Sequence, residues 1–468
     1  MKGLRVCGLR RAHPMISRVN EIASSGKPLV VLCPKDIVLA NKLFNLRAKF
    51  QMLMDRGYVP VFSMNILLQL LGFGSTVMVA KFLLPAELAM VKTAQAYAAV
   101  AVILAGVGLT APILRFCADS RFGEEAQQVM LRTALRAVAY VSAIVVAIIL
   151  LVVSGALGLD AQPGRVYALY ALVLPALALT GLLYVYLQAR QQFGALAKNQ
   201  AVIKLASVCL VVWATYVWGL YGLLVMTVVV AYLGLLPLLR LTVVRRRPPT
   251  VVINLPLGFY RFAFYGMAGM FVSALGQSSD FILMDLVGTD RTDVGRYALA
   301  SVFFLGAATL TGSIQAVITP RFTTLLADPP QFMAYLRGWI PKIVILSLAV
   351  ACTTVAMGWI LQIWFFGEKY VGFVDYLAIL MLKYVVWSSY AVVGSAMLGA
   401  GIIKSGTWVA VATTTVSFAL GYPLCKWWGA TGAAVAQVSV AVLSLGLILW
   451  VQKLEFNRLF GMSLRAAR

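Results

Sequence analysis

The chain has 468 residues, of which 62% are hydrophobic and 12% are charged, about half of the roughly 25% charged residues expected in a soluble domain. A mean hydropathy of +0.90 excludes an ordinary soluble enzyme and indicates that most of the chain lies in lipid. The net charge of +23 would suggest nucleic-acid binding in a soluble protein, so its distribution along the chain must be examined.

Residues 1–56 are basic and contain three prolines and one short apolar patch, Leu29–Cys33. This patch is too short for the core of a signal peptide. We predict a cytoplasmic N-terminal arm, and the equally open alternative is that the protein begins at Met52 or Met54.

Eleven runs without Lys, Arg, Asp or Glu follow, each near or above the roughly 18 residues that a spanning helix needs. They are 57–80, 93–114, 137–159, 166–189, 205–239, 262–279, 297–320, 343–367, 384–403, 405–425 and 427–452. The run 205–239 is too long for one crossing and holds Trp218-Gly219-Leu220-Tyr221-Gly222 near its middle, so it predicts two helices joined by a tight turn. The sequence therefore predicts an all-α polytopic membrane protein with about 12 transmembrane helices.

The helices divide into two sets of six. We predict an N-lobe over residues 57–241 with helices 1–6, a cytoplasmic linker over 242–258, and a C-lobe over 259–452 with helices 7–12. Residues 453–468 are predicted to form a cytoplasmic tail.

The basic residues support one orientation of these helices. With both termini in the cytoplasm, the inner segments carry 31 Lys and Arg residues and the outer loops carry six. This distribution satisfies the positive-inside rule and places the excess charge against the anionic inner leaflet. The charge therefore needs no nucleic acid, and the sequence predicts a multi-pass membrane protein with both termini in the cytoplasm.

Few residues are suited to catalysis or to metal binding. The six cysteines form no CxxC pair, and the single histidine, His13, lies in the basic arm. These counts argue against a zinc site, a structural disulfide and a Ser/His triad. No Walker motif is present, so the sequence predicts a protein without a cofactor that is not an enzyme.

An internal repeat relates the two sets of helices. Shifting the chain by 210 positions places Trp218–Val225 on Trp428–Val435, a shared WGxxGxxV at the outer turn of the last hairpin of each half. Because six is even, both halves have the same orientation, which is typical of transporters that rock two lobes about a central cleft. The glycines themselves are explained by the tight turn and by close helix contact.

Several motifs resemble those of a known family. They are Val79-Ala80-Lys81-Phe82-Leu83-Leu84-Pro85-Ala86-Glu87-Leu88, Gly106-Val107-Gly108-Leu109 and Arg115-Phe116 in the first half, and Gln277-Ser278-Ser279-Asp280-Phe281-Ile282-Leu283, Gly295-Arg296-Tyr297, Pro320-Arg321-Phe322 and Gly429-Ala430-Thr431-Gly432-Ala433-Ala434-Val435-Ala436 in the second. Over about residues 59–452 the chain resembles Wzx-type polysaccharide transporters, flippases of lipid-linked oligosaccharides in the multidrug/oligosaccharidyl-lipid/polysaccharide exporter superfamily. The basic arm is unusual for the group, and the pattern lacks the 14 helices of the peptidoglycan lipid II flippases.

The resemblance implies a flippase that moves an undecaprenyl-pyrophosphate-linked oligosaccharide from the cytoplasmic to the outer leaflet for polysaccharide biosynthesis. Its partners would be the lipid bilayer and the lipid-linked oligosaccharide, with the polymerase and glycosyltransferases of the same pathway as further candidates. Transport would proceed by alternating access between the two lobes.

Three charged residues are predicted to lie at membrane depth: Lys92, Asp280 and Lys383. A charge in the bilayer costs several kcal/mol, about 2.5–3.5 on insertion scales, so each residue is a functional candidate. If helices 2 and 7 line the cleft, as the resemblance implies, Lys92 and Asp280 would pair across an outer gate. The alternative is that each charge snorkels or pairs locally.

The expected cargo suggests further binding residues. The pyrophosphate needs cations, for which the candidates are Lys92, Arg115, Arg321 and Lys383. The candidates for sugar contacts are Asn65, Gln69, Gln95, Tyr97 and Gln277. Both arginines are equally explained as interfacial anchors. Asp280 is the candidate ion-coupling residue, because it is the only carboxylate predicted to lie well inside the membrane.

Two other functions stay open at this point. A multidrug or ion antiporter of the same superfamily would favour an acidic cavity, and one Asp with two Lys argues against it. A membrane polysaccharide polymerase is disfavoured by the lack of a large outer loop and of paired carboxylates.

Overall fold

The computed structural model describes residues 58–119, 122–156, 158, 161–242 and 258–466, which belong almost entirely to the compact unit Val61–Arg468. The predicted arm (residues 1–56) and nearly all of the predicted linker (243–257) lie outside the described residues. The described residues are helical and contain no strand, as the apolar runs predict.

The helices follow one another with short connections. Those of the first half are α3 (Tyr58–Phe82), α4 (Pro85–Leu104), the short η1 (Val107–Leu109), α5 (Thr110–Ala118), α6 (Glu124–Ala156), α7 (Gln162–Ala171), α8 (Leu174–Ala189) and α9 (Phe193–Thr242). Those of the second half are α10 (Phe259–Val287), α11 (Arg291–Thr324), α12 (Pro329–Leu361), the short η2 (Gln362–Phe366) and η3 (Gly367–Tyr370), α13 (Phe373–Gly399) and α14 (Ile403–Ala466).

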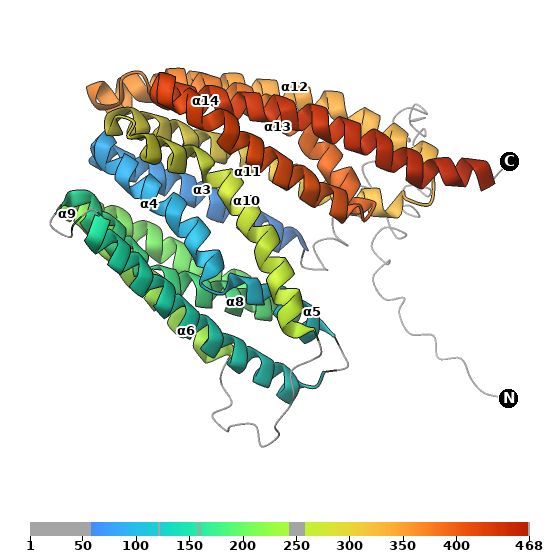
Figure 1. The fold of residues 1–468 in the computed structure, drawn as a ribbon, viewed down its shortest axis with the longest axis horizontal. Helices are drawn as coiled ribbons and strands as arrows, with labels where there is room; N and C mark the ends of the chain where they lie inside the picture. Colours follow the sequence, from blue (N-terminus) through green and yellow to red (C-terminus); the bar gives the residue numbers. More distant parts are fainter. Residues whose placement is uncertain (1–57, 120–121, 157, 159–160, 243–257, 467–468) are drawn as a thin grey trace, which may run out of the picture. The chain divides into compact units, whose positions relative to one another are not determined.

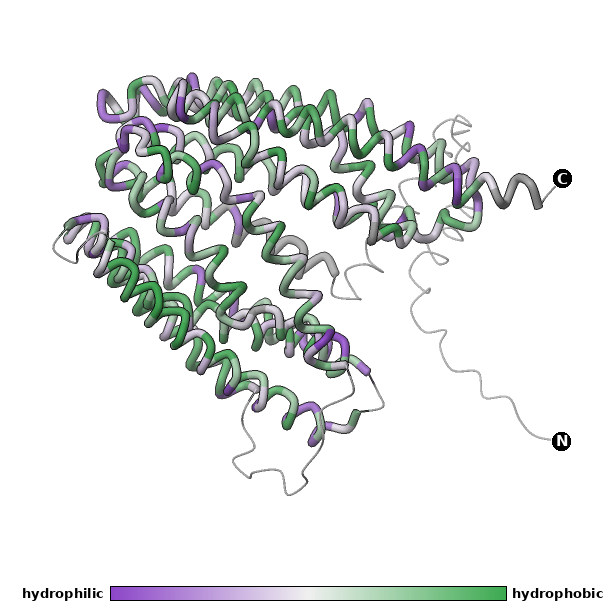
Figure 2. Tube along the Cα trace, in the orientation of Figure 1, coloured by the Kyte–Doolittle hydropathy of each residue, from purple (hydrophilic) through white to green (hydrophobic). Residues whose placement is uncertain are grey.

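The number of membrane crossings agrees with the sequence. Nine helical stretches of the described residues are long and apolar enough to cross a membrane. Two of them, α9 and α14, each contain two helices that meet at a non-helical glycine. If each hairpin crosses twice and α3 crosses once, the described helices agree with the predicted twelve crossings, and the all-α polytopic fold is confirmed. Figure 2 shows apolar residues along most of each helix and hydrophilic ones mainly near the ends.

The repeated glycine motif forms the turn of each hairpin. Gly219 and Gly429 adopt φ angles of 59° and 57°, a region that residues with a side chain rarely adopt. Three positions later, a Cβ on Gly222 or Gly432 would overlap the backbone of the preceding helix. The first glycine therefore makes the turn and the second lets the two helices touch, which confirms the structural reading of the motif.

The sequence predicts helix 2 as one continuous apolar run, but in the structure this helix is interrupted. Its outer part, α4, ends at Leu104, and Gly106 then adopts a φ of 111° before η1 and α5 continue the crossing. An added Cβ on Gly106 would lie 2.9 Å from the Val138 side chain. The break thus lets α6 pack closely against helix 2. Helix 4 is likewise divided, because a short turn separates the end of α7 at Ala171 from the start of α8 at Leu174, where Pro175 is the second residue.

The segment predicted as a C-terminal tail is helical in the structure. Residues 453–466 continue α14 without a break. The rings of Phe456 and Phe460 each pack 5.4 Å from the Phe332 ring of α12. Aromatic residues on one helix face anchor this extension to the second half.

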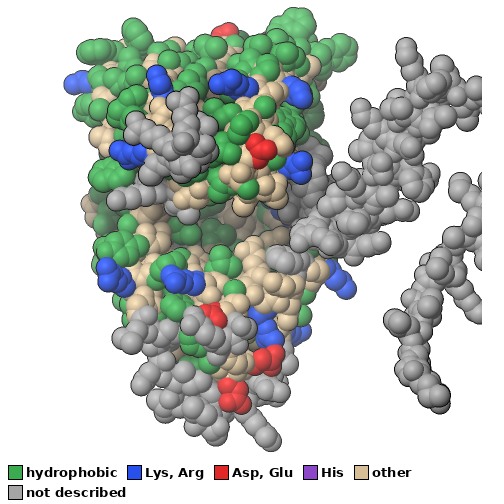
Figure 3. Space-filling view, turned by 90° about the vertical axis from the view of Figure 1, so that its right-hand side faces the viewer, with side chains coloured by type: hydrophobic (Ala, Val, Ile, Leu, Met, Phe, Trp, Pro, Cys, Tyr) green, Lys and Arg blue, Asp and Glu red, His purple; other side chains and the backbone are tan. Residues whose placement is uncertain are grey.

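Within this unit the helices form two groups (Figure 1). The helices α6, α8 and α9 lie on one side and α12, α13 and α14 on the other, with α4, α10 and α11 between them. Ile113 and Tyr186 belong to a buried core of the first half. Phe303 and Phe373 belong to a core of the second half that also includes Leu88 of α4, so the two halves share packing through α4. Figure 3 views one end of the unit, where Lys and Arg side chains are scattered over both halves.

Candidate functional site

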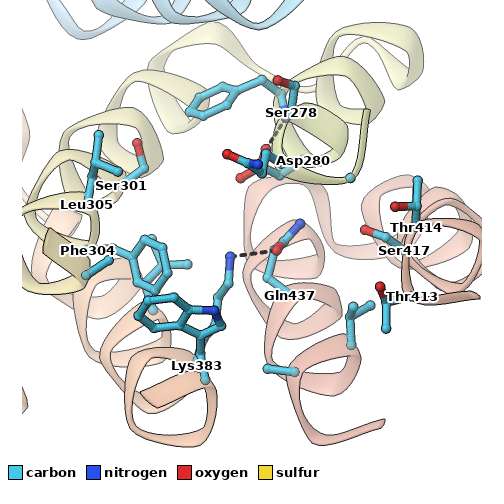
Figure 4. Close-up of a pocket in the computed structure, with 18 of the residues that line it drawn as sticks. Ser278, Asp280, Ser301, Phe304, Leu305, Lys383, Thr413, Thr414, Ser417 and Gln437 are labelled. Atoms are coloured by element: carbon cyan, nitrogen blue, oxygen red, sulfur yellow. Dashed lines mark hydrogen bonds between the residues drawn. The ribbon is translucent and has the colours of Figure 1, made fainter. Parts of the chain in front are cut away.

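A cavity of about 660 Å³ lies where α4 of the first half faces four helices of the second half, α10, α11, α13 and α14. We call it the central cavity, and Figure 4 shows part of it. Its polar and charged lining residues are Lys92, Gln95, Ser273, Gln277, Ser278, Asp280, Tyr297, Ser301, Lys383, Tyr390, Thr413, Thr414, Ser417, Gln437 and Ser444. Hydroxyl and amide groups thus dominate the polar lining, which suits a ligand with many hydrogen-bonding groups.

The single carboxylate that lines the central cavity accepts hydrogen bonds from neutral donors. Asp280 is 8% exposed, and its Oδ2 accepts a hydrogen bond of 2.6 Å from the Tyr297 hydroxyl of α11. Its Oδ1 accepts a bond of 2.9 Å from the backbone N–H of Phe281. The aspartate is therefore held within the second half by neutral partners, and two lysines against one carboxylate leave the lining with an excess of positive charge.

Lys383 is positioned by a chain of polar side chains. Its Nζ donates a hydrogen bond of 2.7 Å to Gln437 Oε1 and lies 4.5 Å from the centre of the Phe304 ring. The amide of Gln437 in turn donates to Ser279 at 3.3 Å, and the Ser279 hydroxyl lies 2.7 Å from that of Ser417. An ammonium has three donors, so Lys383 can bond a ligand while it keeps its bond to Gln437.

The structure brings together five of the residues that the sequence singles out. Lys92, Gln95, Gln277, Asp280 and Lys383 all line the central cavity, although they come from three helices. Among the described residues, however, no ion pair joins Lys92 to Asp280, because the aspartate accepts the bond from its own half. The pairing of these two residues across a gate therefore stays a prediction.

Tyr97 and Gln69 lie elsewhere. Tyr97 does not line the central cavity; its hydroxyl donates to Asp285 at 2.9 Å. Gln69 is exposed and lines a separate cavity of about 170 Å³ beside Phe73. Asn65 belongs to α3, and its side chain lies outside the described residues.

The two predicted arginines do not share a pocket. Arg115 is exposed at the end of α5, where its guanidinium lies 4.8 Å from the Phe262 ring and lines a pocket of about 280 Å³ together with Arg261. Arg321 is exposed near the end of α11 and lines none of these cavities. Arg115 therefore shares its pocket with Arg261 and not with Arg321.

Sequence reasoning missed three residues that the geometry makes prominent: Tyr297, Gln437 and Asp285. Gln437 is a buried amide inside an apolar helix. A polar side chain in an uncharged run predicts a position that faces the protein interior, so the sequence did indicate this residue. Asp285 lies close to the end of α10, and its half-buried position between the halves appears only when the helices are packed. Asp280 is thus not the only carboxylate between the two halves. In the described part of the chain, no three His, Cys, Asp or Glu residues gather as a metal site would require.

Residues 56–326, more than half of the chain, match the family described as polysaccharide biosynthesis protein. No curated protein matches the chain significantly.

Solved structures of transporters share the fold. A lipid II flippase MurJ in an inward closed conformation is 12% identical with a TM-score of 0.71 over 86% of this chain and 90% of that one. A multidrug resistance transporter of the MATE family in an inward-facing conformation is 12% identical with a TM-score of 0.67, over 85% and 96% of the two chains. A transporter of the same superfamily from Pyrococcus furiosus, whose binding pocket of reverse polarity suggests a different function, is 13% identical with a TM-score of 0.59, over 85% and 95%. At identities this low, the structural similarity establishes that these proteins share a fold and nothing more.

Proposed function

Because the chain belongs to the family of polysaccharide biosynthesis proteins, we propose that it is a flippase for an undecaprenyl-pyrophosphate-linked oligosaccharide. It moves this lipid from the cytoplasmic to the outer leaflet of a bacterial inner membrane, by alternating access between its two halves. The membrane fold and the fold's relatives, which are transporters, support transport rather than catalysis.

The central cavity carries this proposal. A pyrophosphate keeps its negative charges at neutral pH and requires cationic or strongly donating groups. Lys92 and Lys383 supply two ammonium groups, while the only carboxylate of the lining, Asp280, is engaged by Tyr297. A cationic drug would meet two like charges in the same space, which disfavours a multidrug exporter.

The remaining lining suits the sugars. Serine, threonine, glutamine and tyrosine side chains from α10, α11, α13 and α14 surround the two lysines. Trp387 adds an aromatic surface on α13, and such surfaces stack on sugar rings. The lipid tail stays in the bilayer, so only the head group has to enter.

Arg115 and Arg261 provide a first contact on the predicted cytoplasmic side. Both arginines line the same pocket between α5 and α10, with aromatic rings beside them. Guanidinium groups bind phosphate oxygens in a bidentate manner. We expect this pair to hold the substrate phosphates before they reach the central cavity. Arg321, for which the sequence suggests the same role, does not line this pocket.

Asp280 is the candidate ion-coupling residue. Without a Walker motif, movement must draw on an ion gradient, on the membrane potential or on consumption of the product. A carboxylate that lines the same cavity as two lysines can link its own proton or cation to the occupancy of that cavity.

The proposal is tested by depleting the protein and extracting the undecaprenyl pyrophosphate sugars, with leaflet-selective labelling to locate the completed units. We expect them to accumulate on the cytoplasmic side and to be flipped again when the wild type is restored. Lys383→Met should restore flipping at a rate about 10- to 100-fold lower, because a charge-assisted hydrogen bond contributes about 1.5–3 kcal/mol.

The matched control is Lys369→Met, which removes an exposed lysine of η3 outside the cavity and should flip normally. If completed units still reach the outer leaflet of depleted cells and only their polymerisation stops, the protein is a polymerase or its partner and not the flippase.

A further inference from the structure

Asp285 of α10 joins the second half to two helices of the first half. Its Oδ2 accepts a hydrogen bond of 2.9 Å from the hydroxyl of Tyr97 on α4. Its Oδ1 accepts one of 3.2 Å from the hydroxyl of Tyr167 on α7. The two tyrosine rings meet edge to face with centroids 6.1 Å apart. One carboxylate therefore clamps two helices, with one oxygen for each.

This cluster lies toward the predicted outer end of the helices. Asp285 is two residues before the end of α10, and Tyr167 is in the second turn of α7. Neither residue lines the central cavity, whose wall on α10 includes Asp280, about one and a half turns deeper. Asp285, Tyr167 and Arg291 instead line a small pocket of about 300 Å³ beside the α10–α11 connection.

The other contacts between the halves at this end are less specific. A Cβ on Gly295 of α11 would overlap the backbone of Pro85 at the start of α4. The Tyr370 hydroxyl donates to the Leu83 carbonyl at 3.4 Å, and Lys81 lies 4.1 Å from the centre of the Phe365 ring. Hydrogen bonds to a carboxylate are about twice as strong as neutral ones and are directional, whereas the buried apolar contact of Leu88 with the second half is not directional.

We propose that Asp285, with Tyr97 and Tyr167, is the latch that holds the outer side of the transporter closed. This inference rests on the proposed function for the orientation and for the opening between the halves. The latch makes no contact with the head group, so it sets the balance between the closed and open conformations and not the choice of substrate. When the halves part, water replaces the tyrosine hydroxyls around the half-buried carboxylate, which makes the closure reversible.

The test measures how a cavity thiol is reached from each side of the membrane. Ser301, a half-buried residue of the cavity wall, is replaced by Cys in a protein whose six native cysteines are changed to Ser. A membrane-impermeant maleimide is then applied to intact spheroplasts, which expose the outer side, and to inverted membrane vesicles, which expose the inner side.

In the variant that carries both Tyr97→Phe and Tyr167→Phe, we expect the labelling rate from the outer side to rise about tenfold or more, because two charge-assisted hydrogen bonds are lost. The labelling rate from the inner side should not rise, because it changes only by the fraction of molecules that leaves the inward-open conformation. Asp285→Ala should give the same shift, and combining all three changes should add nothing further, because the three residues act as one unit.

The matched control is Arg296→Gln. This change breaks the 2.9 Å ion pair between Arg296 and Asp293. The pair lies at the same end of the helices, but both residues belong to α11, so both labelling rates should stay unchanged. Labelling does not depend on substrate, so the latch can be upheld or rejected whether or not the protein flips lipid-linked sugars. Unchanged rates in the tyrosine variant, or rates that rise from both sides through loosened packing, would show that the cluster is not a latch.

Discussion

At the scale of single residues, the partner of Asp280 decides the charge that the central cavity offers. Asp280 and Lys92 are predicted at comparable depth, and if helices 2 and 7 line the cleft, as the family resemblance implies, they would pair across an outer gate; the alternative is that each pairs locally. In the structure the carboxylate instead accepts a 2.6 Å bond from Tyr297, which leaves the ammonium of Lys92 available to an anionic ligand.

We expect Tyr297→Phe to lower the free energy of unfolding by about 1–3 kcal/mol, because the buried carboxylate loses one of its donors. In an Asp280→Asn background the same change should cost much less, since a neutral amide needs the hydroxyl less. Thermal unfolding in detergent of the two single variants and the double variant measures this coupling.

The comparison is the same cycle with Lys92→Ala in place of Tyr297→Phe, where we expect little coupling. A larger coupling energy between Lys92 and Asp280 than between Tyr297 and Asp280 would show that Asp280 pairs with Lys92 and not mainly with Tyr297.

At the scale of the helices, a short glycine motif determines where each of the two long helical hairpins turns and how closely its two helices pack. Each WGxxG places one glycine at a turn with φ near +60° and a second where two helix backbones touch. Because α9 and α14 repeat the arrangement, the last hairpin of each half has the same geometry. The second hairpin also supplies Gln437 and Ser417 to the central cavity, one from each of its helices.

Gly432→Ala should lower the free energy of unfolding by about 1–3 kcal/mol, because the added methyl group overlaps the Leu424 carbonyl and the backbone cannot yield cheaply. The control is Gly446→Ala in the same helix, where an added Cβ meets nothing within 4 Å. This control should be neutral or more stable, since alanine favours helix by about 1 kcal/mol. Equal melting temperatures for the two variants would contradict the role assigned to the close contact.

At the scale of the whole molecule, the asymmetry of charge sets the orientation in the membrane. Predicted inner segments carry 31 basic residues and outer loops six, so the membrane potential and the anionic inner leaflet both favour one orientation. Every proposal about a cytoplasmic phosphate contact or an outer latch depends on that orientation.

The orientation predicts opposite labelling of two exposed alanines. Ala161 precedes α7 on the predicted outer side, and Ala327 lies between α11 and α12 on the predicted inner side. In the cysteine-free protein, Ala161→Cys should react with an impermeant maleimide in intact spheroplasts and Ala327→Cys only in inverted vesicles. The reverse pattern would invert the predicted topology.

The sequence by itself determined the helical membrane fold and the two hairpins, and it predicts about twelve crossings with Lys92, Asp280 and Lys383 at membrane depth. These features depend on interactions that are local along the chain. The length of an apolar run, the cost of a charge in lipid and the backbone freedom of glycine need no knowledge of distant residues.

Only the tertiary structure decided which side chains meet. Tyr97 bonds Asp285, 188 positions away, instead of lining the central cavity, and Arg115 lies beside Arg261 instead of Arg321. Gln437 reaches Lys383 across 54 positions. Most of the surface of a membrane helix is apolar, so its sequence says little about which side faces which partner, and the rotation of each helix is set by packing between helices that are distant in the chain.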